Sequence, residues 1–182
     1  TLKRPKSLAL YEKRPVIGRI TTTTNDTRHR RKGSFVWFKA KDAQDVRGGD
    51  SVFSGEKSNL SIGFKDGSAV SVGENSLVVF NEYDNKMMPD LQLGNFNFKV
   101  NGTANVMIDG QMTTVQGKNS EIQVVLRKGA KPVVKLLKGT AQIETPEEAS
   151  KPLVINQVAK IKLKDDSFIP PKNVILTDYK KE

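Results

Sequence analysis

The stretch from Gly49 to Phe80 contains two short alternating runs on either side of Asp66-Gly67. Apolar residues occupy every second position of residues 60–64, and the same alternation returns over residues 70–73. Side chains of a strand point alternately to opposite faces, so each run can bury one face and expose the other to water. The Asp-Gly pair supplies the positive φ angles that a tight two-residue turn requires. The stretch therefore predicts a β-hairpin centred on Asp66-Gly67.

The same kind of pattern continues along the chain. Residues 96–100 alternate aromatic or aliphatic with polar side chains, and Asn101-Gly102 and Asp109-Gly110 are two further signals for tight turns. About a dozen short strands, separated by turns, indicate an all-β fold, either a sandwich or a barrel-like domain. The alternative is a β-solenoid, because glycines recur between residues 94 and 139.

Seven local expectations complete the secondary structure. They are a short helix over residues 7–14, a strand over 16–24, an exposed turn over 28–33, a core strand over 35–38, a polar mobile segment over 81–90, a loop over 144–152 and a strand over 159–163. The turn over 28–33 is expected to be exposed because its basic side chains and histidine cannot all be buried or paired locally. The run Phe35–Phe38 is assigned to the core because it is apolar and contains the only tryptophan.

Charge divides the chain into an arm and a body. The formal net charge is +10, of which residues 1–32 carry +8, whereas residues 33–159 are neutral overall. A length of 182 residues suits one domain with tails. We expect a basic N-terminal arm over residues 1–15, a β domain over 16–165 and a C-terminal linker over 166–182.

The residue inventory speaks against an enzyme. The chain has no cysteine, which excludes disulfides, thiol catalysis and cysteine-ligated metals. Its one histidine, His29, lies in the basic run and is expected to be a solvated neighbour of arginines, and no nucleophile elbow accompanies it. The carboxylate pairs Glu147-Glu148 and Asp165-Asp166 lie in loop-like segments where adjacent side chains diverge. We expect no catalytic site, no metal site and no cofactor.

Three aspartates, Asp50, Asp66 and Asp109, precede or lie beside glycines in turn-like segments. Such carboxylates commonly accept hydrogen bonds from nearby backbone N–H groups. We therefore interpret these residues as turn formers and not as calcium ligands.

A longer motif runs through the predicted hairpin. It consists of Gly49-Asp50, Ser54-Gly55, Ser58–Phe64, Asp66-Gly67-Ser68, Val70–Val72 and Asn75-Ser76-Leu77. The motif resembles that of the FecR domain family over residues 16–163, most specifically over 49–77. The resemblance implies turn or structural roles for six residues: Gly49, Asp50, Asp66, Gly67, Ser68 and Asn75.

The FecR resemblance also implies a function and a location. Members are bacterial extracytoplasmic domains, usually tethered to the inner membrane, and some relay a transporter's state to a sigma factor. We expect a periplasmic sensor, signal-relay or protein-interaction module of an envelope protein, tethered by a segment outside this sequence, that binds its partner by strand addition. The alternative is a structural or peptidoglycan-binding module that stacks glycan on Trp37, Tyr83 and Phe96.

The basic run offers the candidate contacts with an anionic partner, namely Arg28, Arg30, Arg31 and Lys32. Against anionic lipid headgroups each such residue contributes about 1 kcal/mol. A solvated segment without a partner is an equally open interpretation of this run. Nucleic-acid binding is the least favoured, because the body of the chain is neutral and shows no interleaved aromatic platform.

Overall fold

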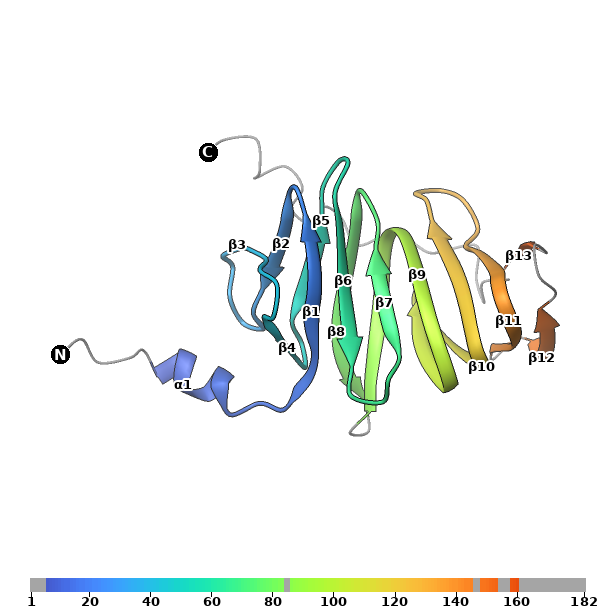
Figure 1. Cartoon of the computed structure of the whole chain (residues 1–182), viewed down its shortest axis with the longest axis horizontal. Helices are drawn as coiled ribbons and strands as arrows, with labels where there is room; N and C mark the ends of the chain where they lie inside the picture. The colour runs from blue at the N-terminus through green and yellow to red at the C-terminus, as the bar shows by residue number, and fades with distance from the viewer. Residues whose placement is uncertain (1–5, 84–85, 146–147, 154–157, 161–182) are drawn as a thin grey trace.

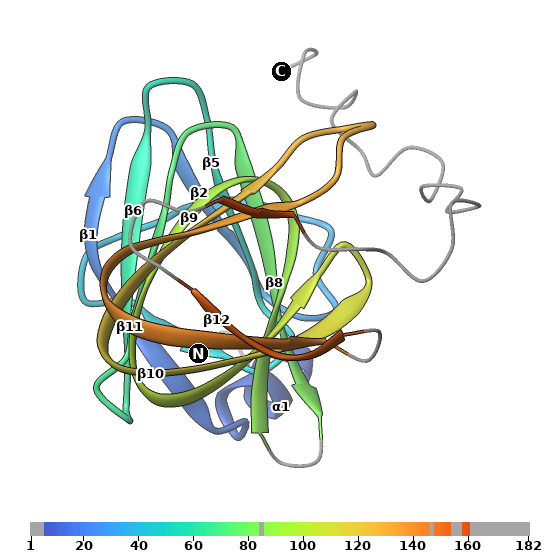
Figure 2. The same cartoon turned by 90° about the vertical axis from the view of Figure 1, so that its right-hand side faces the viewer.

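The computed structural model describes residues 6–83, 86–145, 148–153 and 158–160, with side chains described over 8–82 and 88–145. Its strands form one sheet that curls into a half-barrel, which Figure 1 shows from the side and Figure 2 from one end. The prediction of an all-β fold is confirmed. Every described strand pair is antiparallel, so the alternative of a solenoid built from parallel coils is wrong.

The described elements are α1 (Lys6–Glu12), β1 (Val16–Thr24), β2 (Thr27–Arg30), β3 (Phe38–Lys39), β4 (Asp45–Arg47), β5 (Ser51–Ser54), β6 (Asn59–Phe64), β7 (Ala69–Val72), β8 (Ser76–Tyr83), β9 (Lys86–Ile108), β10 (Gln111–Leu126), β11 (Val133–Thr145), β12 (Glu148–Leu153) and β13 (Val158–Lys160). One path through the sheet has the order β3-β2-β5-β8-β9-β7-β6-β1-β4. A second path leaves β9 through β10 and β11 to β12 and β13 (Figure 1). Strand β9 is therefore the junction of the two paths.

The predicted hairpin of β6 and β7 is confirmed, but its turn differs from the expected one. The strands pair up to Gly63 and Ala69. The backbone N–H of Gly67 donates to the carbonyl of Phe64 at 3.1 Å, and only Gly67, with φ of 83°, has a positive φ in this turn. That pattern belongs to a three-residue loop whose glycine forms a bulge. The expected two-residue turn is wrong because Asp66 keeps a negative φ.

The two other tight-turn signals have opposite outcomes. Asp109 and Gly110 both have positive φ, 51° and 76°, and connect the paired residues Ile108 and Gln111, so this two-residue turn is confirmed. Asn101-Gly102 does not form a turn, because β9 continues through it while remaining paired with β10. With φ of 117°, Gly102 adopts a conformation that favours glycine within the long strand.

The core lies inside the curl and joins both paths of the sheet. The alternating residues of the hairpin and of β9 and β10 are buried, among them Ile62, Phe96 and Ile122, which are at most 1% exposed. These side chains belong to one hydrophobic cluster that runs from β1 to β11. Since burial of apolar area is the main driving force of folding, the two paths fold around one core.

Both the basic run over residues 28–33 and the apolar run over residues 35–38 differ from their expected structures. Residues 28–30 do not form an exposed turn: they belong to β2, which pairs with β5. Residues 35–38 do not form a core strand: most of them are a loop, and the side chain of Phe35 is 93% exposed. The physical reason is period-two alternation, which directs Thr27 and His29 inward and the neighbouring arginines outward.

The remaining local expectations divide in the same way. The strand over 16–24 and a short helix within the N-terminal arm are confirmed. The mobile segment over 81–90 is wrong, since residues 81–83 belong to β8 and 86–90 to β9. Much of the loop expected over 144–152 is strand β12, and the strand over 159–163 is described only up to Lys160. The expected linker over 166–182 lies outside the described residues.

Helix α1, with seven residues, is the one helix in the described part of the chain, and it is too short to cross a bilayer.

Candidate functional site

The structure brings the basic run of β2 together with the apolar run that follows it. The guanidinium of Arg30 lies 4.9 Å from the ring centre of Trp37, and that of Arg31 lies 5.6 Å from the ring centre of Phe38. Both distances are within the range of cation–π attraction. The aromatic–arginine surface consists of Arg28, Arg30, Arg31, Lys32, Phe35, Val36, Trp37 and Phe38. The apolar run that is expected in the core therefore lies against the basic run instead.

The loop that completes this surface is held by its own hydrogen bonds. The backbone N–H of Ser34 donates to the carbonyl of Arg31 at 3.0 Å, and the backbone N–H of Val36 donates to the Ser34 hydroxyl at 3.0 Å. Gly33, with φ of 78°, supplies the left-handed residue of the turn. The loop presents Phe35, 93% exposed, together with Val36, which is 55% exposed. Adjacent exposed apolar side chains indicate an interaction surface more strongly than single, scattered ones do.

The surface is also positively charged. The guanidinium of Arg28 is neutralised by Asp26, with nitrogen–oxygen distances of 2.8 and 2.9 Å. Within the described residues, no carboxylate forms an ion pair with Arg30, Arg31 or Lys32. Uncompensated cations thus lie beside exposed apolar side chains.

A buried polar cluster supports the surface from beneath. Asp50 is 0% exposed and His29 is 1% exposed, and the Nε2 of His29 lies 2.8 Å from Oδ2 of Asp50. The Tyr11 hydroxyl on α1 donates to the same oxygen at 2.6 Å. The backbone N–H groups of Lys32 and Arg47 donate to the carboxylate at 3.1 and 3.0 Å. The expectation that His29 is a solvated neighbour of arginines is wrong, because its side chain is buried and forms a hydrogen bond with Asp50.

The hydrogen bonds of Gln44 determine the tautomer of His29. Its Oε1 accepts from the backbone N–H of Lys41 at 3.0 Å, so its Nε2 is the atom that donates to Nδ1 of His29 at 2.8 Å. Nδ1 is therefore an acceptor, and the imidazole proton lies on Nε2 and is donated to Asp50. Both ring nitrogens are occupied, which leaves neither free to exchange a proton with a substrate. The geometry makes His29 a structural clamp between β2 and the turn before β5.

Two pKa values respond to this cluster. Burial alone would raise the pKa of Asp50, but the hydrogen bonds from His29, Tyr11 and the backbone of Arg47 outweigh it and hold that pKa below the ordinary 3.8. Burial, the hydrogen bond to Asp50 and the charge of Asp50 raise the pKa of Tyr11 well above the ordinary 10.0. The cluster is thus most stable with Asp50 charged and Tyr11 neutral.

Stability is expected to fall at both ends of the pH range because of this cluster. The folded pKa of Asp50 is depressed, so its contribution is present above the ordinary 3.8 and is lost as pH falls through the folded value. The folded pKa of Tyr11 is raised, so its contribution is present below 10.0 and is lost as pH rises above it. Denaturant unfolding between pH 2 and 11 measures both limbs. The Tyr11→Phe variant should lose less stability above pH 10 than the parent chain; an equal loss in both would contradict the assignment.

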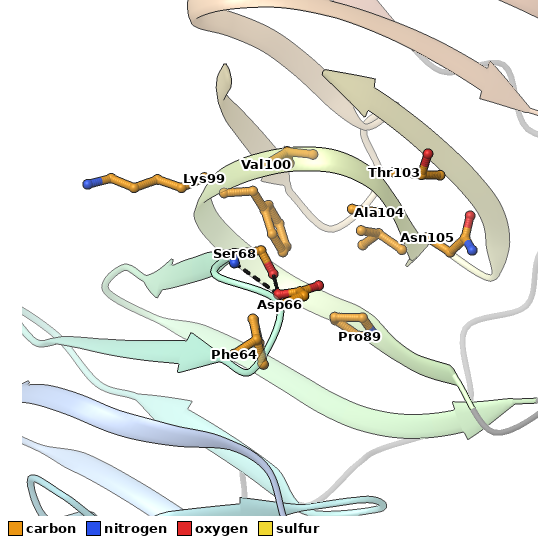
Figure 3. Close-up of a pocket in the computed structure, with 11 residues that line it drawn as sticks. Phe64, Asp66, Ser68, Pro89, Lys99, Val100, Thr103, Ala104 and Asn105 are labelled. Carbon is orange, nitrogen blue, oxygen red and sulfur yellow. Dashed lines mark hydrogen bonds between the residues drawn. The ribbon is translucent and has the colours of Figure 1, made fainter. Parts of the chain in front are cut away.

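A cavity lies between the β6–β7 turn and the bend of β9 (Figure 3), and none of its lining residues belongs to the aromatic–arginine surface. Its volume is about 290 Å³. Its lining residues are Phe64, Asp66, Ser68, Pro89, Phe98, Lys99, Val100, Thr103, Ala104, Asn105 and Val106. Oδ1 of Asp66 accepts from the backbone N–H of Ser68 at 2.9 Å and from the Ser68 hydroxyl, as a turn-forming aspartate does. Its other carboxylate oxygen lies at the cavity rim.

Other predicted residues occupy separate places. Gly49 and Asn75 adopt positive φ of 86° and 51° in turns away from the cavity. Of the three aromatics considered for glycan stacking, Phe96 is fully buried and Trp37 is partly buried beneath Arg30. The side chain of Tyr83 lies outside the described residues. Phe96 therefore cannot stack on a sugar, and the three aromatics do not form one exposed face.

The predicted carboxylate pairs lie where the structure gives no side chains, at Glu147-Glu148 and Asp165-Asp166. Over the described residues, no group of three acidic or histidine side chains is arranged to hold a metal ion.

Sequence reasoning missed the Asp50–His29 cluster and the exposure of Phe35. The alternation from Thr27 to Arg30 was the available signal for the first, since it places His29 on the same face as Thr27.

Comparisons of the chain with protein-family models, with curated proteins and with solved structures give no match.

Proposed function

We propose that this chain is a non-enzymatic, FecR-like interaction module of a membrane-tethered envelope protein, and that its aromatic–arginine surface rests on an anionic membrane. The observation that carries the proposal is the side chain of Phe35, 93% exposed at a loop tip beside cations that no described carboxylate neutralises. Apolar tips enter the boundary between headgroups and acyl chains, and neighbouring Lys and Arg side chains contact the headgroups.

The expected free energy of membrane binding is large enough to strengthen an existing membrane attachment. Each basic residue near an anionic leaflet contributes about 1 kcal/mol, and full burial of a phenylalanine side chain contributes about 1.5–3 kcal/mol. Arg30, Arg31 and Lys32 together with Phe35 therefore give an attraction of several kcal/mol, which is weaker than a membrane-spanning segment. Such a surface orients a domain that another segment already holds near the bilayer.

Nucleic acid is the competing occupant, because basic and aromatic side chains also form platforms for bases. Stacking a base requires a free ring face. Arg30 lies over the ring of Trp37, and Arg31 lies over that of Phe38. Phe35, 93% exposed, and the aliphatic Val36, 55% exposed, reach furthest into water, whereas Phe38 is 47% exposed and shares its ring with Arg31. This combination favours a lipid interface over a row of stacked bases.

Orientation on a membrane also supports the expected role in relay or protein binding. Helix α1, which precedes the β domain, is attached beside this surface, because Tyr11 bonds Asp50 and Arg14 donates to the carbonyl of Gly48 at 3.1 Å. Strands β10 and β11 lie toward the other end of the molecule (Figure 1). A domain bound to the membrane through the aromatic–arginine surface would leave the strands at the other end accessible to envelope proteins. The peptidoglycan alternative is weaker, since Phe96 is buried.

Vesicle co-sedimentation of the full chain tests the proposal. We expect binding to vesicles of phosphatidylglycerol and phosphatidylcholine, weak binding to phosphatidylcholine alone, and a decrease in binding as salt rises. The double variant Phe35→Ser with Val36→Ser should weaken binding by roughly tenfold, since about 1.4 kcal/mol corresponds to a factor of ten. The matched control is Leu137→Ser, which removes another exposed apolar residue, 37% exposed, on β11; it should leave binding unchanged.

Three outcomes would overturn the membrane contact. The first is equal binding to anionic and neutral vesicles, and the second is equal binding by the Phe35/Val36 variant and the Leu137→Ser control. The third is retention of a single-stranded oligonucleotide that the Phe35/Val36 variant loses while vesicle binding is absent, which would assign the surface to nucleic acid.

A further inference from the structure

The long strand β9 has an edge that the described part of the sheet leaves open. On one side β9 pairs with β10 from Gly94 to Ile108. On its other side β7 pairs only with residues 96–99, ending at Lys99 opposite Ala69. Among the described residues, no strand pairs with that side of β9 over residues 101–108. The backbone N–H and C=O groups of an open edge are a template for another strand.

The cavity at the Asp66 turn lies directly beside this open edge. Thr103 and Asn105 line it from β9, and Asp66 and Ser68 line it from the β6–β7 turn (Figure 3). Its volume of about 290 Å³ is at the lower limit of small-molecule pockets, which makes it the size of a side-chain pocket. An extended segment pairing with residues 101–108 would direct alternate side chains toward the cavity.

The lining of the cavity is apolar at its base. Phe98, Val100 and Val106 are between 3% and 7% exposed, and Pro89 is buried beside them. A partner side chain that enters must therefore carry an apolar stem, since a polar stem would lose its water without gaining a partner.

The rim of the cavity carries one charge directed at its mouth. Oδ1 of Asp66 is occupied by Ser68, whereas Oδ2 has no hydrogen-bond or ion-pair partner among the described residues. The side chain of Lys99 extends away from the cavity (Figure 3). Thr103 also lines the cavity, and Oδ1 of Asn105 accepts from the Thr114 hydroxyl at 2.9 Å. The negative group of the rim selects a cation.

We propose that a partner polypeptide adds an extended strand along residues 101–108 of β9 and inserts a lysine or arginine side chain into this cavity. The methylene stem would pack on Phe98 and Val100, and the cationic head would reach Oδ2 of Asp66, as long basic side chains bury their stems and keep their heads at polar rims. Main-chain pairing supplies affinity, and the cavity supplies specificity for the basic residue. The site shares no residue with the aromatic–arginine surface, so it stands or fails independently of the membrane contact.

The test is a titration of the full, isotopically labelled chain with extended peptides, followed through its backbone amide resonances. One peptide has alternating threonine and valine with a central lysine, and its matched partner has norleucine, which keeps the stem and removes the charge. We expect shifts at Ser68 and over residues 101–108, with the lysine peptide binding roughly fivefold more tightly than the norleucine peptide. A peptide with central glutamate should bind more weakly than either.

Variants separate the charge from the shape of the site. Asp66→Asn keeps an oxygen that accepts from Ser68 and removes only the charge, so it should make the lysine and norleucine peptides equal. Ala104→Leu fills the cavity and should weaken binding of both peptides. Equal binding of lysine and norleucine peptides to the parent chain, or shifts confined to other strands, would overturn the proposal. Binding of butylamine as tight as that of the lysine peptide would also overturn it, by showing a site for free amines without strand addition.

Discussion

Replacement of Asp50 by alanine is expected to lower the free energy of unfolding by about 3–5 kcal/mol, as expected when one partner of a buried polar pair is removed. The carboxylate is 0% exposed and accepts hydrogen bonds from the Tyr11 hydroxyl, from Nε2 of His29 and from two backbone N–H groups. Alanine leaves these donors without an acceptor in a site that water does not reach. Each buried, unsatisfied donor costs about 1–3 kcal/mol.

Chemical denaturation of the variant and its controls measures this loss. Asp66→Ala makes the same change on an exposed turn and should cost no more than about 1 kcal/mol, the usual loss for one local hydrogen bond. Tyr11→Phe removes a single donor to Asp50 and should cost about 1 kcal/mol. If Asp50→Ala proved no more costly than Asp66→Ala, the buried cluster would not be the clamp described above.

The second large effect is expected at Gly94, where substitution by alanine should cost about 3–5 kcal/mol, as for the strongest steric and backbone effects of single mutations. Gly94 has φ of 113°, and a Cβ there would lie 2.1 Å from Oγ and 2.5 Å from Cα of Ser76. Ser76 cannot move aside, because its hydroxyl accepts from the backbone N–H of Asn95 and donates to the carbonyl of Glu74, both at 2.9 Å. The clash falls where β9 passes from β8 to its pairing with β10.

Gly110→Ala is the matched control for this prediction. Gly110 also has a positive φ, 76°, but a Cβ there would meet nothing within 4 Å. Its substitution should therefore cost about 1 kcal/mol, the conformational part alone. Thermal and denaturant unfolding of the two variants compares them directly. Similar losses in both would show that the approach of Ser76 to Gly94 is not what requires glycine.

Local physics accounts for the parts of the fold that sequence reasoning predicted. The β6–β7 hairpin follows from two alternating runs and a glycine between them. The turn at Asp109-Gly110 follows from two residues that tolerate positive φ, and it connects neighbouring strands without help from elsewhere. Strand β1 follows from a β-branched run. In each case the residues that form the element are also those that signal it.

Long-range pairing accounts for the parts that sequence reasoning missed. Asn101-Gly102 has the same turn signal as Asp109-Gly110, but β10 stays paired with β9 on both sides of it, so the strand continues. The open edge of β9 and the cavity beside Asp66 exist because β7 ends at Ala69 while β9 runs on. The points at which β7 and β9 end depend on pairing with other strands and cannot be predicted from either segment alone.

Period-two alternation, turn chemistry and charge are local properties, so the sequence is enough to predict an all-β protein with a hairpin around Gly67 and a basic segment over residues 1–32. The positions of the basic run and of its histidine depend instead on contacts between residues far apart in the sequence. Alternation along β2 places His29 and the arginines on opposite faces, and the hydrogen bond between His29 and Asp50, 21 residues away, fixes the histidine face as the buried one. The apolar run after β2 stays outside the hydrophobic cluster, so an expected core strand is mostly an exposed loop beside β2.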